Sequence, residues 1–161
     1  MQCTLLEWLN SEWLAEDVTP LPWNLSVDYM PIPVVRAKIE FMEQMFGCVV
    51  EQTDVQVGAI QTPGKDADVA FWATVKFSLY HSEFPNGVKH ICGTASIYAG
   101  QYSGTWALAQ VCESLATTRA FAKHWKQFGK GLNDKDDPMK DMKAPAKKTN
   151  DKISQTLKNI S

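Results

Sequence analysis

The sequence lacks clustered cysteines and long apolar runs, and it has few cations in its first third. Its four cysteines, Cys3, Cys48, Cys92 and Cys112, have no Cys-x-x-Cys spacing, which excludes a compact zinc site and predicts free thiols. Charged residues or prolines interrupt every apolar stretch before it reaches the roughly 18 residues of a membrane span. The first residues have neither the basic nor the apolar region of a signal peptide, so we expect a cytoplasmic protein with no membrane partner.

Charge is distributed unevenly along the chain. Residues 1–60 hold nine acidic and two basic residues, whereas residues 113–131 hold one acidic and four basic residues. Residues 132–161 add seven lysines and five aspartates. The net charge of −2 conceals this separation, which indicates a confined basic surface suited to a polyanion.

Hydrophobic periodicity predicts three strands with helices before and after them. Apolar residues at helical spacing indicate two helices early in the chain, and alternating runs indicate the strands. A stripe with steps of three and four residues predicts a final helix that packs on the sheet. The predicted elements are helices over 3–16 and 33–46, strands over 49–60, 69–80 and 88–98, and a helix over 105–132.

These elements define an α+β fold class, an antiparallel three-stranded meander backed by a long C-terminal helix in the order α-α-β-β-β-α. The proline-containing stretches between the first two helices predict loops. We divide the chain into three parts. Residues 1–28 form an N-terminal helix and loop expected to contact other subunits, residues 29–133 form the core, and residues 134–161 form a tail expected to be flexible.

The sharpest functional signal is a row of cations in the last predicted helix. Arg119, Lys123, Lys126 and Lys130 follow at steps of four, three and four residues, which places them on one helix face along about 16 Å. No acidic residue lies within this stretch, so the predicted helix offers the cations no carboxylate partner. A linear row of cations matches a linear polyanion; the alternative is a solvated face paired with acids elsewhere.

Aromatic side chains accompany these cations. Tyr98, Tyr102 and Trp106 surround a glycine-containing stretch, Gly100 to Gly104, and Trp72 and Tyr80 share the non-core face of the middle strand with Lys76. Exposed rings beside cations suit the stacking of unpaired bases, whereas the alternative places these rings in the core or a subunit interface. The glycine-containing stretch opens the predicted helix and is suited either to hold a phosphate or simply to start that helix.

Signals for enzymatic chemistry are weak. The stretch from Gly58 to Lys65 differs from a phosphate-binding loop, because five residues separate its glycines and Asp66 follows where Ser or Thr holds magnesium. His81 and His90 flank the hairpin turn near Glu83. These residues are either a metal site or simply a pair of surface histidines. We find no nucleophile and base at suitable spacing, so we expect no enzyme activity and no cofactor.

Three stretches occur together in a characteristic order. The first runs from Tyr29-Met-Pro-Ile-Pro-Val-Val to Met45-Phe46-Gly47, and the second is Ala73-Thr-Val-Lys76-Phe-Ser-Leu79. The third begins Ala116-Thr-Thr-Arg119, continues through Lys123 and Lys126, and ends Phe128-Gly129-Lys-Gly131-Leu132. Over residues 29–133 the chain thereby resembles the Rad fifty-two superfamily, the eukaryotic single-strand annealing proteins and their phage Sak relatives.

The resemblance implies an oligomeric ring or filament with a positively charged groove between sheet and helix, in which single-stranded DNA lies with its bases exposed. Lys123 and Lys126 match basic positions of the family's inner DNA site, and Lys76 matches a basic position on the strand. The chain departs from the family at Ala122, where a third helix lysine is usual, and at Arg119, where an acid often stands. Its compact length is similar to that of phage or bacterial members.

We therefore expect an ATP-independent single-strand annealing protein of recombination and repair, in the cytosol of a bacterium or a phage-infected host. The expected DNA-binding residues are Lys76, Tyr102, Arg119, Lys123, Lys126 and Lys130. Candidate partners are single-stranded DNA, further copies of the chain, and an exonuclease or single-strand-binding protein. One alternative is a double-stranded RNA-binding domain, whose cations cluster at the start of the last helix. The other is a small-molecule hydrolase on a helix-backed sheet.

Overall fold

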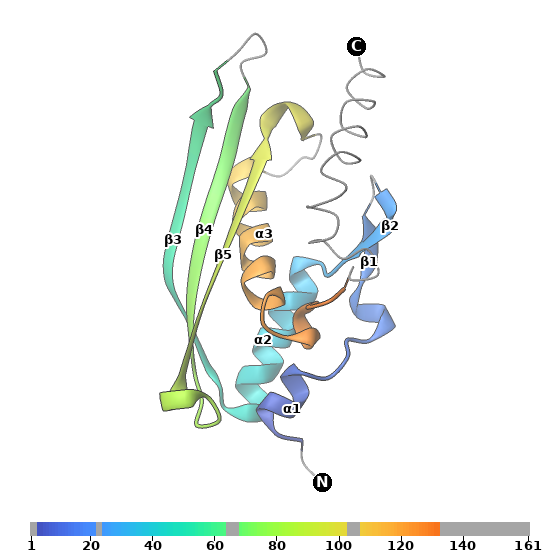
Figure 1. Ribbon diagram of the computed structural model, residues 1–161, viewed down its shortest axis with the longest axis vertical. Helices are drawn as coiled ribbons and strands as arrows, with labels where there is room; N and C mark the ends of the chain where they lie inside the picture. The colour runs from blue at the N-terminus through green and yellow to red at the C-terminus, as the bar shows by residue number, and fades with distance from the viewer. Residues whose placement is uncertain (1–2, 22–23, 64–67, 103–106, 133–161) are drawn as a thin grey trace.

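Three long strands form an antiparallel sheet in the order β3-β4-β5. The strands are β3 (Val49–Gln61), β4 (Val69–Tyr80) and β5 (Val88–Tyr98). The computed structural model, which describes residues 3–21, 24–63, 68–102 and 107–132, packs α3 (Leu108–Ala122) against this sheet, with α2 (Ile32–Phe46) on the same side (Figure 1). The arrangement confirms the predicted α+β class.

Alternation of side chains along β4 explains why the sheet forms here. The apolar side chains of Ala73, Val75 and Leu79 are buried, whereas Lys76 and Tyr80 are exposed on the other face. We call the face that carries Lys76 the outer face. The turn between β4 and β5 contains Asn86 and Gly87, with φ angles of 57° and 74°. The amide of Gly87 donates to the carbonyl oxygen of Phe84 at 2.8 Å, which closes the turn, and the hairpin lies where the sequence predicted it.

The contact between α3 and β5 is unusually close. A Cβ atom on Gly93 of β5 would clash with the carbonyl oxygen of Ala116 and would lie 2.6 Å from the amide nitrogen of Ala120. The residues of α3 that are buried at this contact are therefore small, Cys112, Ala116 and Ala120, and next to them the ring of Phe121 packs against Phe77 of β4 at 5.3 Å between centroids. The predicted stripe was correct only in part: Val111 and Leu115 are half-buried, whereas their neighbours Cys112 and Ala116 are fully buried against the sheet. Trp125, which the stripe also contains, is buried.

The final helix is shorter than predicted. It ends at Ala122, and Trp125 adopts an extended conformation with φ −135° and ψ 137° before a short 3-10 turn, η4 (Lys126–Phe128). Trp125 is buried, with its ring 6.1 Å from Phe84 and 6.2 Å from Phe121 between centroids. This aromatic packing outweighs the local helical pattern. The predicted helix start at Thr105 lies outside the described residues.

The N-terminal segment also differs from its prediction. The expected helix over 3–16 contains only α1 (Leu5–Leu9) and, after an irregular stretch, the start of a 3-10 turn, η1 (Ala15–Asp17). The Glu83 carboxylate accepts hydrogen bonds from the amides of Leu5 and Leu6 at 3.0 and 3.1 Å, which satisfies the exposed start of α1. Leu5 and Leu9 are fully buried against the core of the same chain, so this apolar stripe is already covered.

A small hairpin replaces the loops expected after this segment. Strands β1 (Thr19–Leu21) and β2 (Asn24–Tyr29) pair antiparallel, with an irregularity between Pro20 and Leu21. Proline is tolerated at this position because β1 is an edge strand of a two-stranded sheet. The prolines around this hairpin are the reason that the sequence pattern favoured loops.

The close contact at Gly93 makes a direct prediction about stability. We expect Gly93→Ala to reduce the free energy of unfolding by about 3 kcal/mol or more, because the added methyl group meets helix backbone that cannot rotate away. Urea unfolding measures the loss. Ser96→Ala, on the exposed outer face of the same strand, is the control and should change stability by less than about 0.5 kcal/mol. Equal stability of the two variants would contradict this packing.

Candidate nucleic-acid interface

Two of the predicted cations lie together beside the outer edge of β5, which is the edge that pairs with no other strand of the described sheet. Arg119 and Lys123, one turn apart near the end of α3, are both exposed. The guanidinium of Arg119 donates a hydrogen bond to the carbonyl oxygen of Thr94 at 3.2 Å, and the Lys123 ammonium donates one to that of Cys92 at 3.2 Å. Both cations are therefore positioned by uncharged acceptors, which leaves their charge intact.

The spacing of this pair follows from the strand. Thr94 and Cys92 are two residues apart on β5, so their outward carbonyls are separated by about 6.6 Å. This distance is close to that between successive phosphates of an extended nucleic-acid strand. Because β5 is an edge strand, no further strand of the described sheet covers this side. The edge and the two cations together form a line that is open to a polyanion.

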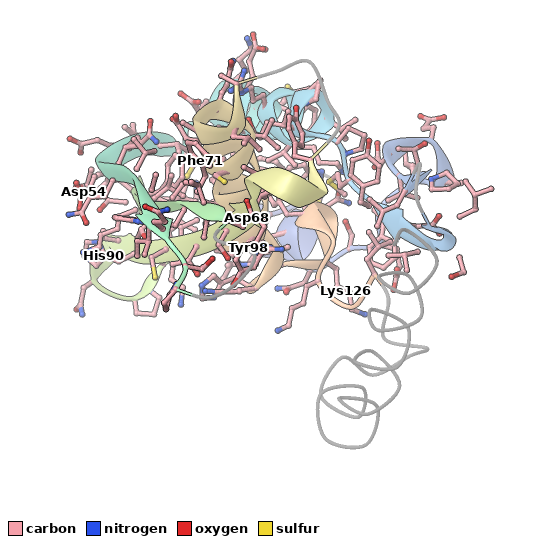
Figure 2. All side chains as sticks on the ribbon, turned by 90° about the horizontal axis from the view of Figure 1, so that it is seen from above. Asp54, Asp68, Phe71, His90, Tyr98 and Lys126 are labelled. Atoms are coloured by element: carbon pink, nitrogen blue, oxygen red, sulfur yellow. The ribbon has the colours of Figure 1, made fainter. Side chains whose placement is uncertain are left out.

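Lys126 and Lys130 do not extend this line along one helix face, because α3 ends before them. Lys126 instead forms an ion pair with Glu12, 3.3 Å between Nζ and Oε1. The acidic partner comes from the N-terminal segment, so for this residue the alternative of a paired solvated face is confirmed. Figure 2 shows Lys126 well apart from His90 on the sheet. The predicted single row of four cations was therefore wrong.

A second group of cations surrounds His124, just after α3. Burial, together with the charges of Lys89, Lys123 and Lys130, lowers the pKa of His124. Lys130 is exposed, and no acid among the described residues forms an ion pair with it. The sequence did not predict that Lys89 belongs to this group, because only the register of β5 brings it close to the end of α3. The basic surface thus continues from Lys123 toward Lys89 and Lys130.

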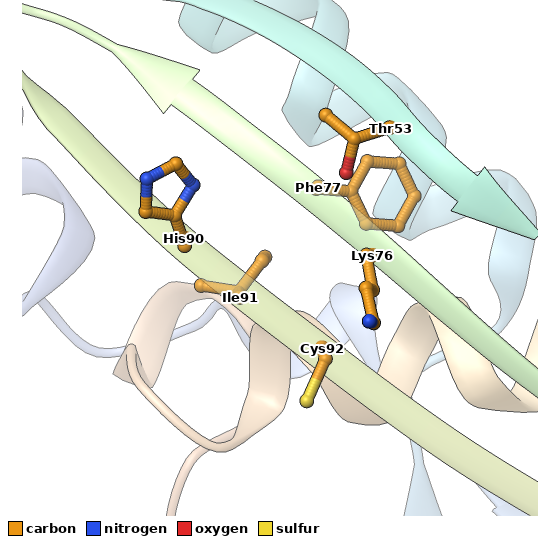
Figure 3. A pocket seen from close by; sticks show the side chains of 6 residues that line it. All are labelled: Thr53, Lys76, Phe77, His90, Ile91 and Cys92. Atoms are coloured by element: carbon orange, nitrogen blue, oxygen red, sulfur yellow. The ribbon is translucent and has the colours of Figure 1, made fainter.

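Lys76 lies on the outer face of the sheet, next to the same part of β5. It pairs in register with Cys92 on one side and with Asp54 on the other. A shallow pocket of about 260 Å³ opens here, lined by Thr53, Lys76, Phe77, His90, Ile91 and Cys92. Figure 3 shows the Lys76 side chain extending toward Cys92. Lys76 and Lys123 therefore approach Cys92 from opposite sides, although neighbouring Asp54 offsets part of the Lys76 charge.

Tyr102 lies beyond the far end of β5, away from the cation pair along the strand. It is half-buried and follows a short 3-10 turn, η3 (Ala99–Gln101). The amide of Gly100 in this turn donates to both oxygens of the Asp68 carboxylate, each at 3.1 Å. The Asp68 carboxylate thus binds the Gly100 amide, which belongs to the stretch that the sequence suggested for holding a phosphate. Residues 103–106, including the predicted ring of Trp106, lie outside the described residues.

The histidines of the β4–β5 hairpin contact different partners. His81 bonds the carbonyl oxygen of Phe46 through Nε2 at 3.0 Å, whereas His90 Nδ1 lies 2.8 Å from the Ser78 hydroxyl. Within the described ranges, no group of three or more His, Cys, Asp or Glu side chains could hold a metal ion.

Comparisons with protein-family models and with curated proteins gave no match to this chain. Among the described helices, none has both the length and the apolar character that crossing a membrane requires.

The cations around His124 predict a pH dependence of polyanion binding. The lowered pKa keeps His124 neutral near pH 7, and a bound polyanion would offset the cationic repulsion and raise that pKa. Binding would then take up a proton, so affinity should rise as pH falls, by at most about tenfold per unit. Fluorescence anisotropy with a labelled oligonucleotide between pH 8 and 5.5 measures this. The same pH dependence in His124→Gln would contradict the assignment.

Proposed function

We propose that this protein binds single-stranded DNA along the outer edge of β5 and anneals complementary strands without enzymatic chemistry. The observation that carries the proposal is the pair of exposed cations, Arg119 and Lys123, beside an open strand edge. Neither forms an ion pair with a carboxylate in the part of the chain that the structure describes. Cations that are held in place but not neutralised suit contact with a row of phosphates.

The distribution of charge supports the same proposal. The chain has a net charge of −2, so within the part that the structure describes a polyanion is attracted where the cations gather, around Arg119, Lys123 and Lys130. Contacts to phosphates carry no base preference, which annealing of arbitrary sequences requires. The resemblance to the Rad fifty-two superfamily points to the same activity, with a strand held by its backbone and its bases left for pairing.

The double-stranded RNA-binding alternative shares the order α2-β3-β4-β5-α3. Cations at the start of the last helix would favour it. From Leu108 to Thr118, however, α3 carries no basic residue and one acid, Glu113. Its charge lies at the opposite end of the helix, beside the strand edge. The position of the cations therefore favours a single strand along β5.

The hydrolase alternative would need a reachable nucleophile. Ser78 contacts His90, but Ser78 is only 3% exposed, so a substrate carbonyl has no access to its hydroxyl. The wider hollow between the N-terminal segment and α2, of about 720 Å³, is lined by Lys38, which is paired with Asp17 at 2.8 Å. These arrangements favour a binding protein over an enzyme.

We also propose that the protein assembles into a homo-oligomer, a ring or filament. The N-terminal stripe no longer argues for it, because Leu5 and Leu9 are buried within the chain. The support now comes from β3, an edge strand on which Val55 and Val57 are exposed. Long edge strands with exposed apolar side chains are prone to cover themselves by association.

Annealing tests the proposal directly. Purified protein should accelerate the pairing of complementary oligonucleotides by roughly tenfold or more in the absence of nucleotide and in the presence of EDTA, because neutralising two backbones needs neither. Loss of fluorescence from a donor–quencher pair on the two strands follows the reaction. A requirement for ATP or for a divalent metal would overturn the proposal, as would stronger binding of duplex RNA than of single-stranded DNA in a gel shift.

Salt titration tests the proposed residues. Arg119→Ala and Lys123→Ala should each flatten the log–log dependence of affinity on salt by about 0.7, because each removes one phosphate contact. The loss should be equal for all base sequences. Lys126→Ala should have a smaller effect, because Glu12 already offsets that charge.

Arg36→Ala provides the matched control, because it removes an exposed cation from α2 and changes the net charge equally. Its salt slope should equal that of the wild type. If the slopes of all these variants were the same, the β5 edge would not be the DNA path.

A further inference from the structure

Beyond the cation pair, the outer face of the sheet becomes apolar toward the far end of β5. Two neighbouring rows of paired residues run across the three strands here. They are Gly58–Trp72–Ser96 and Ile60–Ala70–Tyr98. Ile60 is 60% exposed and Tyr98 is 44% exposed, whereas Trp72 is half-buried. The helix α3 packs on the opposite face, so among the described elements no helix covers these side chains (Figure 1).

The half-burial of Trp72 has a specific cause. A Cβ on Gly58 would lie 2.6, 2.6 and 2.7 Å from the indole atoms Cε2, Cζ2 and Nε1. Three adjacent ring atoms at nearly equal distance mean that the indole presents its face to β3. The missing side chain of Gly58 thus lets the ring lie flat on the neighbouring strand. The other face of the indole points away from β3, toward the outer side of the sheet.

Tyr98 and Trp72 are close enough to act together. Tyr98 pairs with Ala70, the second residue before Trp72 on β4, so the two aromatic residues are diagonal neighbours, about 7 to 8 Å apart at Cα. The next row toward the cations is polar and consists of Gln56, Thr74 and Thr94. The result is a small aromatic platform in a polar surface.

The platform continues the line of the cations. Tyr98 lies four residues along β5 from Thr94, whose carbonyl positions Arg119, and this corresponds to about 13 Å. A strand held by its phosphates at Lys123 and Arg119 therefore passes the platform when it follows β5. Aromatic faces bind unpaired bases by stacking, with little dependence on base identity.

We propose that Trp72, Tyr98 and Ile60 form a stacking platform for unpaired nucleobases of a strand whose backbone is held at the β5 edge. This inference rests on the proposed function and adds a second kind of contact, to bases and not to phosphates. Association with a second protein copy is the less favoured occupant, because three large side chains fall far short of the roughly 800 Å² that each partner of a stable interface buries.

A comparison of two probes separates base contacts from backbone contacts. One probe is a fluorescent oligothymidylate, and the other is an abasic deoxyribose-phosphate strand of the same length and charge. Wild-type protein should bind the oligothymidylate more tightly. Tyr98→Leu should weaken oligothymidylate binding about tenfold and leave abasic binding unchanged. Tyr98→Phe, which retains the ring, should keep most of the preference. Thermal melting confirms that the exposed substitutions leave the fold intact.

The outcomes of this experiment are distinguishable. Equal weakening of both probes by Tyr98→Leu, or no weakening of either, overturns the platform while the β5 edge can still bind a strand. Unchanged binding of both probes together with reduced self-association in sedimentation velocity would assign the face to a protein partner. If wild-type protein bound neither probe, the proposed function itself would fail, and the platform with it.

Discussion

The close approach of α3 to β5 at Gly93 is the constraint on which this face of the molecule depends. Because Gly93 has no side chain, the helix backbone at Ala116 and Ala120 lies directly on the strand. The helix is then near enough for Arg119 and Lys123 to reach over the strand edge to carbonyl oxygens. A larger residue at this position would lift the helix and separate the cations from the edge that aligns them.

Local signals were sufficient for the three long strands and for α2. Alternating side chains and the Asn86-Gly87 turn defined the sheet, and Gly47, with φ 67°, ends α2 where expected. The end of α3 could not be predicted in the same way. Residues after Ala122 keep a helical pattern, and only their burial among distant aromatic rings favours the extended conformation of Trp125. Propensity is a weak guide when tertiary packing opposes it.

The arrangement of the predicted cations was only partly foreseen. Helical spacing correctly joined Arg119 and Lys123, but it also joined Lys126, because it assumed one continuous helix. The acid that pairs with Lys126 lies 114 residues away in the sequence, so no local pattern could reveal that contact. The approach of Lys89 likewise depends on strand register. Contacts between distant segments therefore decide which of the cations remain unneutralised.

Cys92 provides a natural site for thiol labelling beside the cations at the β5 edge. Its thiol is exposed between Lys76 and Lys123, whereas Cys48 and Cys112 are buried. Burial raises the pKa of the Cys48 thiol to about 11, which protects it further from alkylation. Once exposed Cys3 is replaced by serine, a maleimide fluorophore or photocrosslinker will attach beside the cations and nowhere else among the four cysteines. The wild-type residue thus permits site-directed labelling of this strand edge without an engineered cysteine.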